Sequence, residues 1–158
     1  MARGQGKGRA DDKRRGRPPS AADYRVEEQV GHLLRRAHQR ATALFLEHIG
    51  AADLTPTQFA ALVKLRDEGR LSQNHLGRLT AMDRATILGV IRRLAARGLI
   101  VRAPDASDGR RTVLSLTPKG RALVDRITPN GVRVSEAILA PLSPGERRAF
   151  LALLRRLS

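Results

Sequence analysis

The stretch LIVRAPDASDGRRTVLSLTPKG, from Leu99 to Gly120, has the pattern of a two-stranded β-hairpin. Apolar and polar residues alternate at both ends, as they do in half-buried strands, and the Pro, Asp, Ser and Gly residues between them suit a tight turn. Arg110 and Arg111 follow this turn directly. A hairpin with guanidinium groups near its tip indicates a polyanionic partner such as nucleic acid.

Two short helices are expected immediately before the hairpin. Ser72 is placed to cap a helix that runs through residue 79, and Asp83 to cap a second one that runs through residue 97. Gly98 then ends the second helix. Two such helices followed by a hairpin form a winged helix-turn-helix, so we predict a mainly α fold with a two-stranded β-wing.

A long amphipathic helix is predicted before this unit, from about Tyr24 to Ile49. Its apolar stripe is too long for a domain of this size to cover, and a partner subunit would cover it. After it, Thr55 begins a capping box with proline at the first helical position, which predicts a helix to about Arg66.

Two more helices are predicted after the hairpin. The first begins at Thr117, and Pro129 and Gly131 should bend or break it before it resumes to about Leu139. A second capping box at Ser143 begins the last helix, which also has an apolar stripe. The N- and C-terminal helices together predict a homodimerisation domain.

The overall composition agrees with a nucleic-acid partner. The chain has 30 Lys and Arg against 15 Asp and Glu, a formal charge of +15. It has no cysteine, which excludes disulfides, thiolate metal sites and cysteine nucleophiles. Because no apolar run is long enough to span a membrane or serve as a signal core, we expect a bacterial cytoplasmic protein that is nucleoid-associated when bound to DNA.

Residues 1–22 differ from the rest in composition and predict a disordered basic arm. Within it, residues 15–18 read Arg-Gly-Arg-Pro and are similar to the core of an AT-hook. In that reading Arg15 and Arg17 would lie in the minor groove of an A·T tract. The alternative is a charged tail that adds only nonspecific affinity.

Six short motifs then follow one another along the chain. They are LTPTQF at 54–59, Leu76 with Leu79, DRATI at 83–87, RGL at 97–99, DGR at 108–110 and LTPKG at 116–120. With them, the chain from about Val30 to Leu157 resembles the MarR family of transcription regulators. The resemblance implies a homodimer that binds a palindromic operator with one winged domain per half-site and usually acts as a repressor relieved by a small ligand.

The resemblance also suggests a division of the chain. The basic arm at 1–22 precedes a dimerisation helix at 23–50, the winged helix-turn-helix domain at 51–117 and C-terminal dimerisation helices at 118–158.

The helix after Asp83 is the expected recognition helix. Its apolar face should pack inward and leave the opposite side toward the major groove, where Arg84 suits a bidentate contact with guanine and Thr86 or Leu88 a thymine methyl. Because relatives commonly have polar or basic residues at the positions of Leu88 and Gly89, these two residues favour readout of shape and backbone. The inward face comprises Ile87, Val90, Ile91 and Leu94, and the DNA side comprises Arg84, Ala85, Thr86, Leu88 and Arg92.

In the wing, the family pattern assigns Asp108 to orient Arg110, which would enter the minor groove beside the half-site. Arg111 is a further candidate DNA contact. The alternative is that Asp108 forms an Asx-turn and both arginines stay in water. Arg92 of the recognition helix is expected to meet phosphates or acidic groups of the protein.

A ligand pocket is implied between the dimerisation helices and the winged domain. Residues 31–37, GHLLRRA, resemble a subgroup that regulates the catabolism of aromatic or heteroaromatic acids, including nicotinate-type compounds. In that subgroup an arginine of this helix pairs with the ligand carboxylate, which carries over to Arg35. Some relatives have histidine where this chain has Ala41, and His38 or His32 is the candidate substitute here, with a solvated histidine as the alternative.

Other classes of function are less compatible with the sequence. The carboxylates are scattered and the histidines lack metal-binding spacing, so we expect no enzyme, metal site or cofactor. A nonspecific or architectural DNA-binding protein is the main alternative, because the arm is basic and the recognition helix has few polar residues. A MarR-type activator and a ligand-free repressor are further alternatives.

Overall fold

The computed structural model describes residues 21–105 and 112–158 of the 158-residue chain. The predicted arm, the AT-hook-like residues 15–18 and the wing tip therefore lie outside the described residues. The chain divides into two compact units, residues 1–37 and 38–158, and each is considered by itself.

In the first unit, two 3₁₀ turns at Ala21–Asp23 and Val26–Glu28 precede the start of helix α1 (Val30–Ile49). The predicted helix start at Tyr24 is therefore wrong. Tyr24 is 64% exposed and Val26 is 52% exposed, so this segment lacks the packing that sustains a helix in water.

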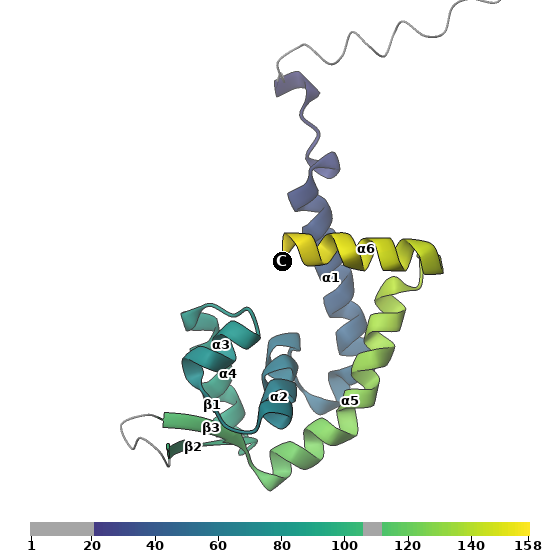
Figure 1. Cartoon of the computed structure of the whole chain (residues 1–158). Helices are drawn as coiled ribbons and strands as arrows, with labels where there is room; N and C mark the ends of the chain where they lie inside the picture. Colours follow the sequence, from purple (N-terminus) through teal and green to yellow (C-terminus); the bar gives the residue numbers. More distant parts are fainter. Residues whose placement is uncertain (1–20, 106–111) are drawn as a thin grey trace, which may run out of the picture. The chain divides into compact units, whose positions relative to one another are not determined.

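The second unit contains the remainder of α1 and all later elements (Figure 1). In chain order these are η4 (Gly50–Ala52), α2 (Pro56–Glu68), β1 (Leu71–Ser72), α3 (Gln73–Leu79), α4 (Arg84–Ala96), β2 (Ile100–Pro104), β3 (Thr112–Leu116), α5 (Pro118–Leu139) and α6 (Pro144–Leu157). This order confirms the winged helix-turn-helix with flanking helices.

The predicted helix starts are confirmed by their capping hydrogen bonds. At each start a side-chain oxygen accepts a hydrogen bond from the backbone N–H three residues later, which satisfies one of the free donors of the first turn. Two starts are full capping boxes in which Gln58 and Glu146 bond back to the cap residue. The caps are Thr55, Ser72, Asp83, Thr117 and Ser143.

The sheet has one strand more than the sequence predicted. Its order is β1-β3-β2, and both pairings are antiparallel. The wing hairpin pairs Ile100 with Leu116 and Pro104 with Thr112. The added strand β1 pairs Leu71 with Leu114. A two-residue strand is too short to show alternation, so its sequence carried no signal.

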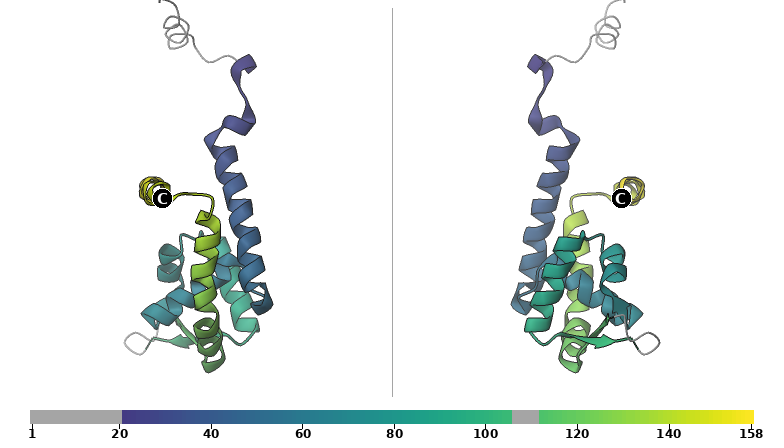
Figure 2. Two further views of the ribbon diagram at one scale, coloured as in Figure 1. Left: turned by 90° about the vertical axis from the view of Figure 1, so that its right-hand side faces the viewer. Right: turned by 90° about the vertical axis from the view of Figure 1, so that its left-hand side faces the viewer.

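The core forms where α2 packs against α3, α4 and α5 (Figures 1 and 2). Burying a large aliphatic side chain stabilises a fold by about 1.5–3 kcal/mol, so these helices hold α4 firmly from its inner side. The fully buried side chains include Leu62, Leu65, Leu76, Ile91, Leu94 and Val124.

The sequence predicted that α5 bends or breaks near Pro129; the helix continues through this residue without a break, and its ribbon changes direction between its first and last turns (Figure 1). Proline cannot donate the backbone hydrogen bond of its turn. Side chains secure the adjacent residues instead: the Thr128 hydroxyl donates to the Val124 carbonyl at 2.6 Å and accepts from Arg66 Nη1 at 2.6 Å. These hydrogen bonds of Thr128 link the turn before the proline to the preceding turn of α5 and to α2.

Gly131, the second predicted breaker, makes room for an aromatic ring. A Cβ atom at this position would lie 2.9 Å from Cζ of Phe59 on α2. That ring in turn contacts Phe45 of α1 edge-on, with 5.6 Å between ring centroids. Gly131 is therefore a packing residue of the α2–α5 contact.

Candidate nucleic-acid interface

Helix α4 presents one buried and one exposed face, as predicted. Ile87, Val90, Ile91 and Leu94 are its buried residues. Of the residues assigned to DNA, Arg84, Ala85, Thr86, Leu88 and Arg92 are all exposed. The direction of the recognition helix's outer face is therefore confirmed by packing, whereas its contacts with DNA remain predictions.

The N-terminus of α4 is fixed by Asp83. Its two carboxylate oxygens accept hydrogen bonds from the Thr86 backbone N–H at 2.8 Å and the Thr86 hydroxyl at 2.7 Å. These bonds, the backbone one first, lower the pKa of Asp83 below its usual value. The Thr86 hydroxyl proton is thus engaged in the cap, which leaves the oxygen free to accept but not to donate.

A shallow groove runs between the outer face of α4 and strand β2. Its volume is about 580 Å³, and most of its walls are apolar. Two guanidinium groups flank it, Arg92 from the helix and Arg102 from the strand, and none of the lining residues that the structure describes is a carboxylate. The other lining residues are Ala85, Leu88, Gly89 and Ala95.

The groove brings together only part of the predicted set. Ala85, Leu88 and Arg92 line it, whereas Arg84 lines a separate hollow beside Asn74 and Arg78 of α3. Arg102 and Arg78 were not predicted as site residues, because the sequence of a single strand or a short helix does not indicate which element that strand or helix faces. The one feature of the sequence that could have indicated them is that both are basic residues in elements next to the recognition helix in the chain.

Arg92 is available to an external partner. The sequence left open whether it meets phosphates or acidic groups of the protein, and in residues 21–105 and 112–158 no ion pair joins it to a carboxylate. An arginine that is exposed and free of internal acids, beside a second arginine, has the chemistry to bind phosphate.

Comparison with known proteins identifies the family. Residues 52–111 match the model of the MarR family. The HTH-type transcriptional repressor NicR of Pseudomonas putida is 45% identical over 140 residues, which cover 89% of each chain. The chain belongs to the MarR family. MarR-family proteins are DNA-binding transcription regulators rather than enzymes, and they are dimers.

Two solved structures extend this MarR-family match to three dimensions. A probable transcriptional regulator from Pseudomonas aeruginosa is 50% identical with a TM-score of 0.81, over 85% of this chain and 100% of that one. BpsR of Bordetella bronchiseptica, described as regulated in its DNA binding by 6-hydroxynicotinic acid, is 44% identical with a TM-score of 0.80. The match covers 85% of this chain and 96% of BpsR.

The remaining DNA-contact residues expected in a MarR-family protein lie outside the described residues. These are Asp108, Arg110 and Arg111 of the wing tip and Arg15 and Arg17 of the arm. The described strands end at Pro104 and begin again at Thr112, in register. The pairing of the two predicted strands of the hairpin is therefore confirmed.

The predicted effector residues are divided between the two units. In the first unit, Arg35 is exposed and its Nη2 lies 3.4 Å from Nδ1 of His32, one helical turn earlier. His38 belongs to the second unit, where it is exposed. Arg35 and His32 are thus close together on α1, as their spacing requires, and their role toward a ligand remains a prediction.

No cluster of His, Cys, Asp or Glu in the described residues could hold a metal ion. Among the helices that the structure describes, none is both long and apolar enough to cross a membrane.

Proposed function

We propose that this protein is a homodimeric repressor that binds a palindromic operator and is released from it by a small aromatic or heteroaromatic carboxylate. The observation that carries the proposal is the α4–β2 groove, in which a helix anchored by buried aliphatic residues presents Arg92 beside Arg102 of the wing. Such a surface suits the edge of a major groove and the adjoining phosphates.

DNA recognition would combine three contributions. Arg84 contacts a guanine, and Leu88, which is 49% exposed, contacts a thymine methyl. Because the centre of the groove is apolar, we propose that shape and backbone contacts supply most of the discrimination. Arg110, oriented by Asp108, enters the minor groove, and Arg111 and the arm residues Arg15 and Arg17 add further contacts.

The test is a competition between promoter DNA and bulk DNA. The protein is expected to select a palindromic sequence from a random pool and to prefer it over bulk DNA by roughly 10³-fold or more at physiological salt. Equal affinity for both would overturn the proposal and favour the architectural alternative, for which the sparse polar content of α4 is the supporting observation. Transcription that rises when the operator is occupied would instead indicate an activator.

The proposed effector class rests on α1 and on the relatives. BpsR is described as regulated by 6-hydroxynicotinic acid, and the exposed guanidinium of Arg35 suits a carboxylate because its two N–H groups match both oxygens. His32 lies close enough to Arg35 to share the ligand, and His38 is a second candidate.

A panel of aromatic acids in thermal-shift and operator-release assays tests this effector proposal. An effector should both stabilise the protein and release operator DNA, and Arg35→Ala should abolish both effects while leaving operator affinity unchanged. Arg35→Lys is the matched variant, because it keeps the charge but loses the bidentate fork. Stabilisation without release would contradict derepression.

The proposal also includes the dimer interface and the cellular compartment of the protein. Phe150, Leu153, Leu154 and Leu157 of α6 are exposed, and α6 has no buried residue among those described. We propose that a second copy covers this stripe together with the apolar residues of α1. The protein would act in the bacterial cytoplasm, on chromosomal DNA.

A further inference from the structure

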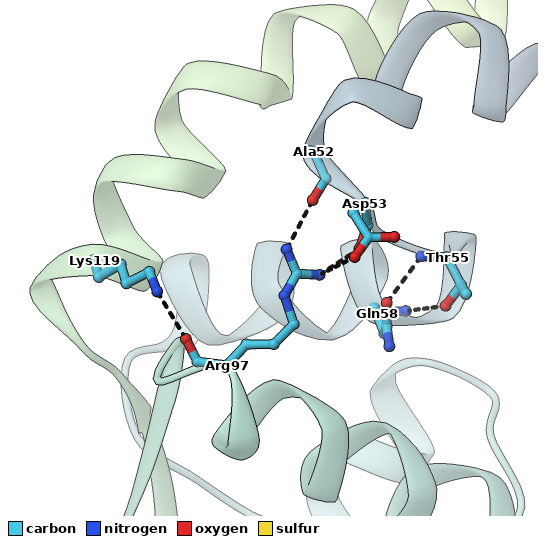
Figure 3. Close-up of polar contacts among 6 residues, drawn as sticks. All are labelled: Ala52, Asp53, Thr55, Gln58, Arg97 and Lys119. Carbon is cyan, nitrogen blue, oxygen red and sulfur yellow. Dashed lines mark hydrogen bonds and ion pairs between the residues drawn. The ribbon is translucent and has the colours of Figure 1, made fainter.

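The side chain of Arg97 joins the C-terminal end of the recognition helix to the connection between α1 and α2 (Figure 3). Its Nη1 donates to the Asp53 carbonyl, and its Nη2 donates to the Ala52 carbonyl at 2.9 Å. The Asp53 carboxylate is almost fully exposed and stays 4.0 Å from Nη1, so the backbone carbonyls are the main acceptors. Asp53 itself has a left-handed backbone, with φ of 49°, in this tight connection.

The backbone at the same place is held by the start of α5. Lys119 Nζ donates to the Arg97 carbonyl at 3.0 Å, and the Thr117 hydroxyl donates to the Gly98 carbonyl at 2.7 Å. The Thr117 backbone N–H donates to the Leu99 carbonyl at 3.0 Å. Three consecutive carbonyls after the recognition helix are thereby bonded to α5.

Helix α5 lies close to residues 97–99, which we call the corner. A Cβ atom at Gly120 would lie 2.0 Å from the Leu99 carbonyl oxygen, so only glycine fits between the helix and the strand. The corner is thus rigid toward α5. Toward the α1–α2 connection, the guanidinium of Arg97 provides the hydrogen bonds found among the described residues.

The position of this corner matters for reading DNA. Helix α4 has 13 residues and so a length of about 20 Å, and a small tilt about its C-terminal end displaces its base-reading N-terminal turns by an ångström or more. Arg97 does not line the α4–β2 groove. It can therefore affect recognition through the direction of the helix without contacting DNA.

We propose that Arg97 is a positioning residue for operator recognition, which sets the angle of the recognition helix by clamping two carbonyls of the α1–α2 connection. This role rests on the proposed function, because it requires that the protein read a specific sequence. A planar, forked donor suits two adjacent carbonyls, whereas lysine offers a single charged point.

The experiment compares Arg97→Ala with wild type on DNA that wild type has selected from a random pool and on bulk DNA, over a range of salt. Arg97→Ala should lose about tenfold or more of its preference for the selected DNA, while its affinity for bulk DNA and its salt slope stay unchanged. Arg97→Lys should recover part of the preference. The matched control is Arg121→Ala, an exposed arginine of α5, which should leave the preference unchanged.

A second variant guards against loss of folding. Lys119→Met removes the bond to the Arg97 carbonyl from the α5 side and should reduce the preference in the same direction, with the helical circular dichroism retained. A salt slope lower by about one for Arg97→Ala would show a direct phosphate contact and overturn the positioning role. A lowered thermal midpoint with unchanged preference would also overturn it. Wild-type protein without any preference would overturn the proposed function itself.

Discussion

Gly131 shows how one missing side chain decides the contact of two helices. Alanine in place of a helical glycine usually adds about 0.5–1 kcal/mol of stability. At Gly131 the new methyl group would lie 2.9 Å from the Phe59 ring, and overpacking of a core typically costs about 1–3 kcal/mol. We therefore expect Gly131→Ala to lower the free energy of unfolding by roughly 1 kcal/mol in urea titrations.

Gly145 of α6 provides the control for this substitution. A Cβ atom there would meet nothing within 4 Å, so Gly145→Ala should be neutral or stabilising. In addition, Phe59→Leu should reduce the cost of Gly131→Ala, because the shorter side chain relieves the contact. Equal effects of the two alanine substitutions would contradict the packing role of Gly131.

Asp83 gives the recognition helix a pH-dependent cap. Because hydrogen bonds to Thr86 lower its pKa in the folded state, Asp83 stabilises the fold at pH values above the unfolded pKa of about 3.9. This contribution is lost as the pH falls through the lowered folded value. Below about pH 4, wild type should therefore lose stability more steeply than Asp83→Asn, whose amide caps the helix without titrating. Parallel pH profiles in chemical denaturation would exclude this linkage.

At the scale of elements, the α4–β2 groove predicts a phosphate-binding residue that the sequence did not indicate. Arg102 is exposed on β2 and faces the same groove as Arg92. Arg102→Ala should weaken binding to all DNA sequences to a similar extent and lower the salt slope by about one. Fluorescence anisotropy at several salt concentrations measures both effects, with Arg121→Ala as the control. An unchanged slope would mean that Arg102 contacts no phosphate.

The elements also show which features could be predicted from sequence. The caps at Thr55, Ser72 and Asp83 were predicted because their hydrogen-bond partners lie only three residues away. The buried face of α4 was predicted because its apolar residues repeat at helical spacing within the helix itself. Features that depend on distant partners could not be predicted. Strand β1 forms by pairing with β3, which is distant in sequence. The proposed role of Arg97 likewise follows from its hydrogen bonds to distant backbone carbonyls.

In the candidate site, too, local features could be predicted from the sequence and the arrangement of separate elements could not. The exposed side of α4 followed from the pattern of its apolar residues, but the separation of Arg84 from the groove depends on where α3 lies. The arrangement of Arg92 with Arg102 depends likewise on how β2 packs against the helix. Periodicity predicts the face on which a residue lies, and tertiary packing determines what that face adjoins.

For the whole molecule, the exposed stripe of α6 predicts how dimerisation supports DNA binding. Leu153 is 56% exposed and Leu154 is 37% exposed, on a helix without buried residues in the described chain. An exposed apolar stripe of this kind marks an interface with another chain. Glutamate in place of both residues should prevent dimerisation, because burying a charge without a partner is costly.

The double variant Leu153→Glu with Leu154→Glu separates assembly from recognition. A dimer binds its second half-site as an intramolecular event, so the monomeric variant should lose at least about tenfold in affinity for a full palindrome while keeping its affinity for a single half-site. Light scattering gives the oligomeric state and anisotropy the two affinities. Arg148→Glu is the matched control, since it introduces the same charge on the opposite side of α6 from the apolar stripe and should leave a dimer. A double variant that remains dimeric would place the interface elsewhere on the chain, whereas a monomer with full affinity for the palindrome would show that each winged domain binds independently.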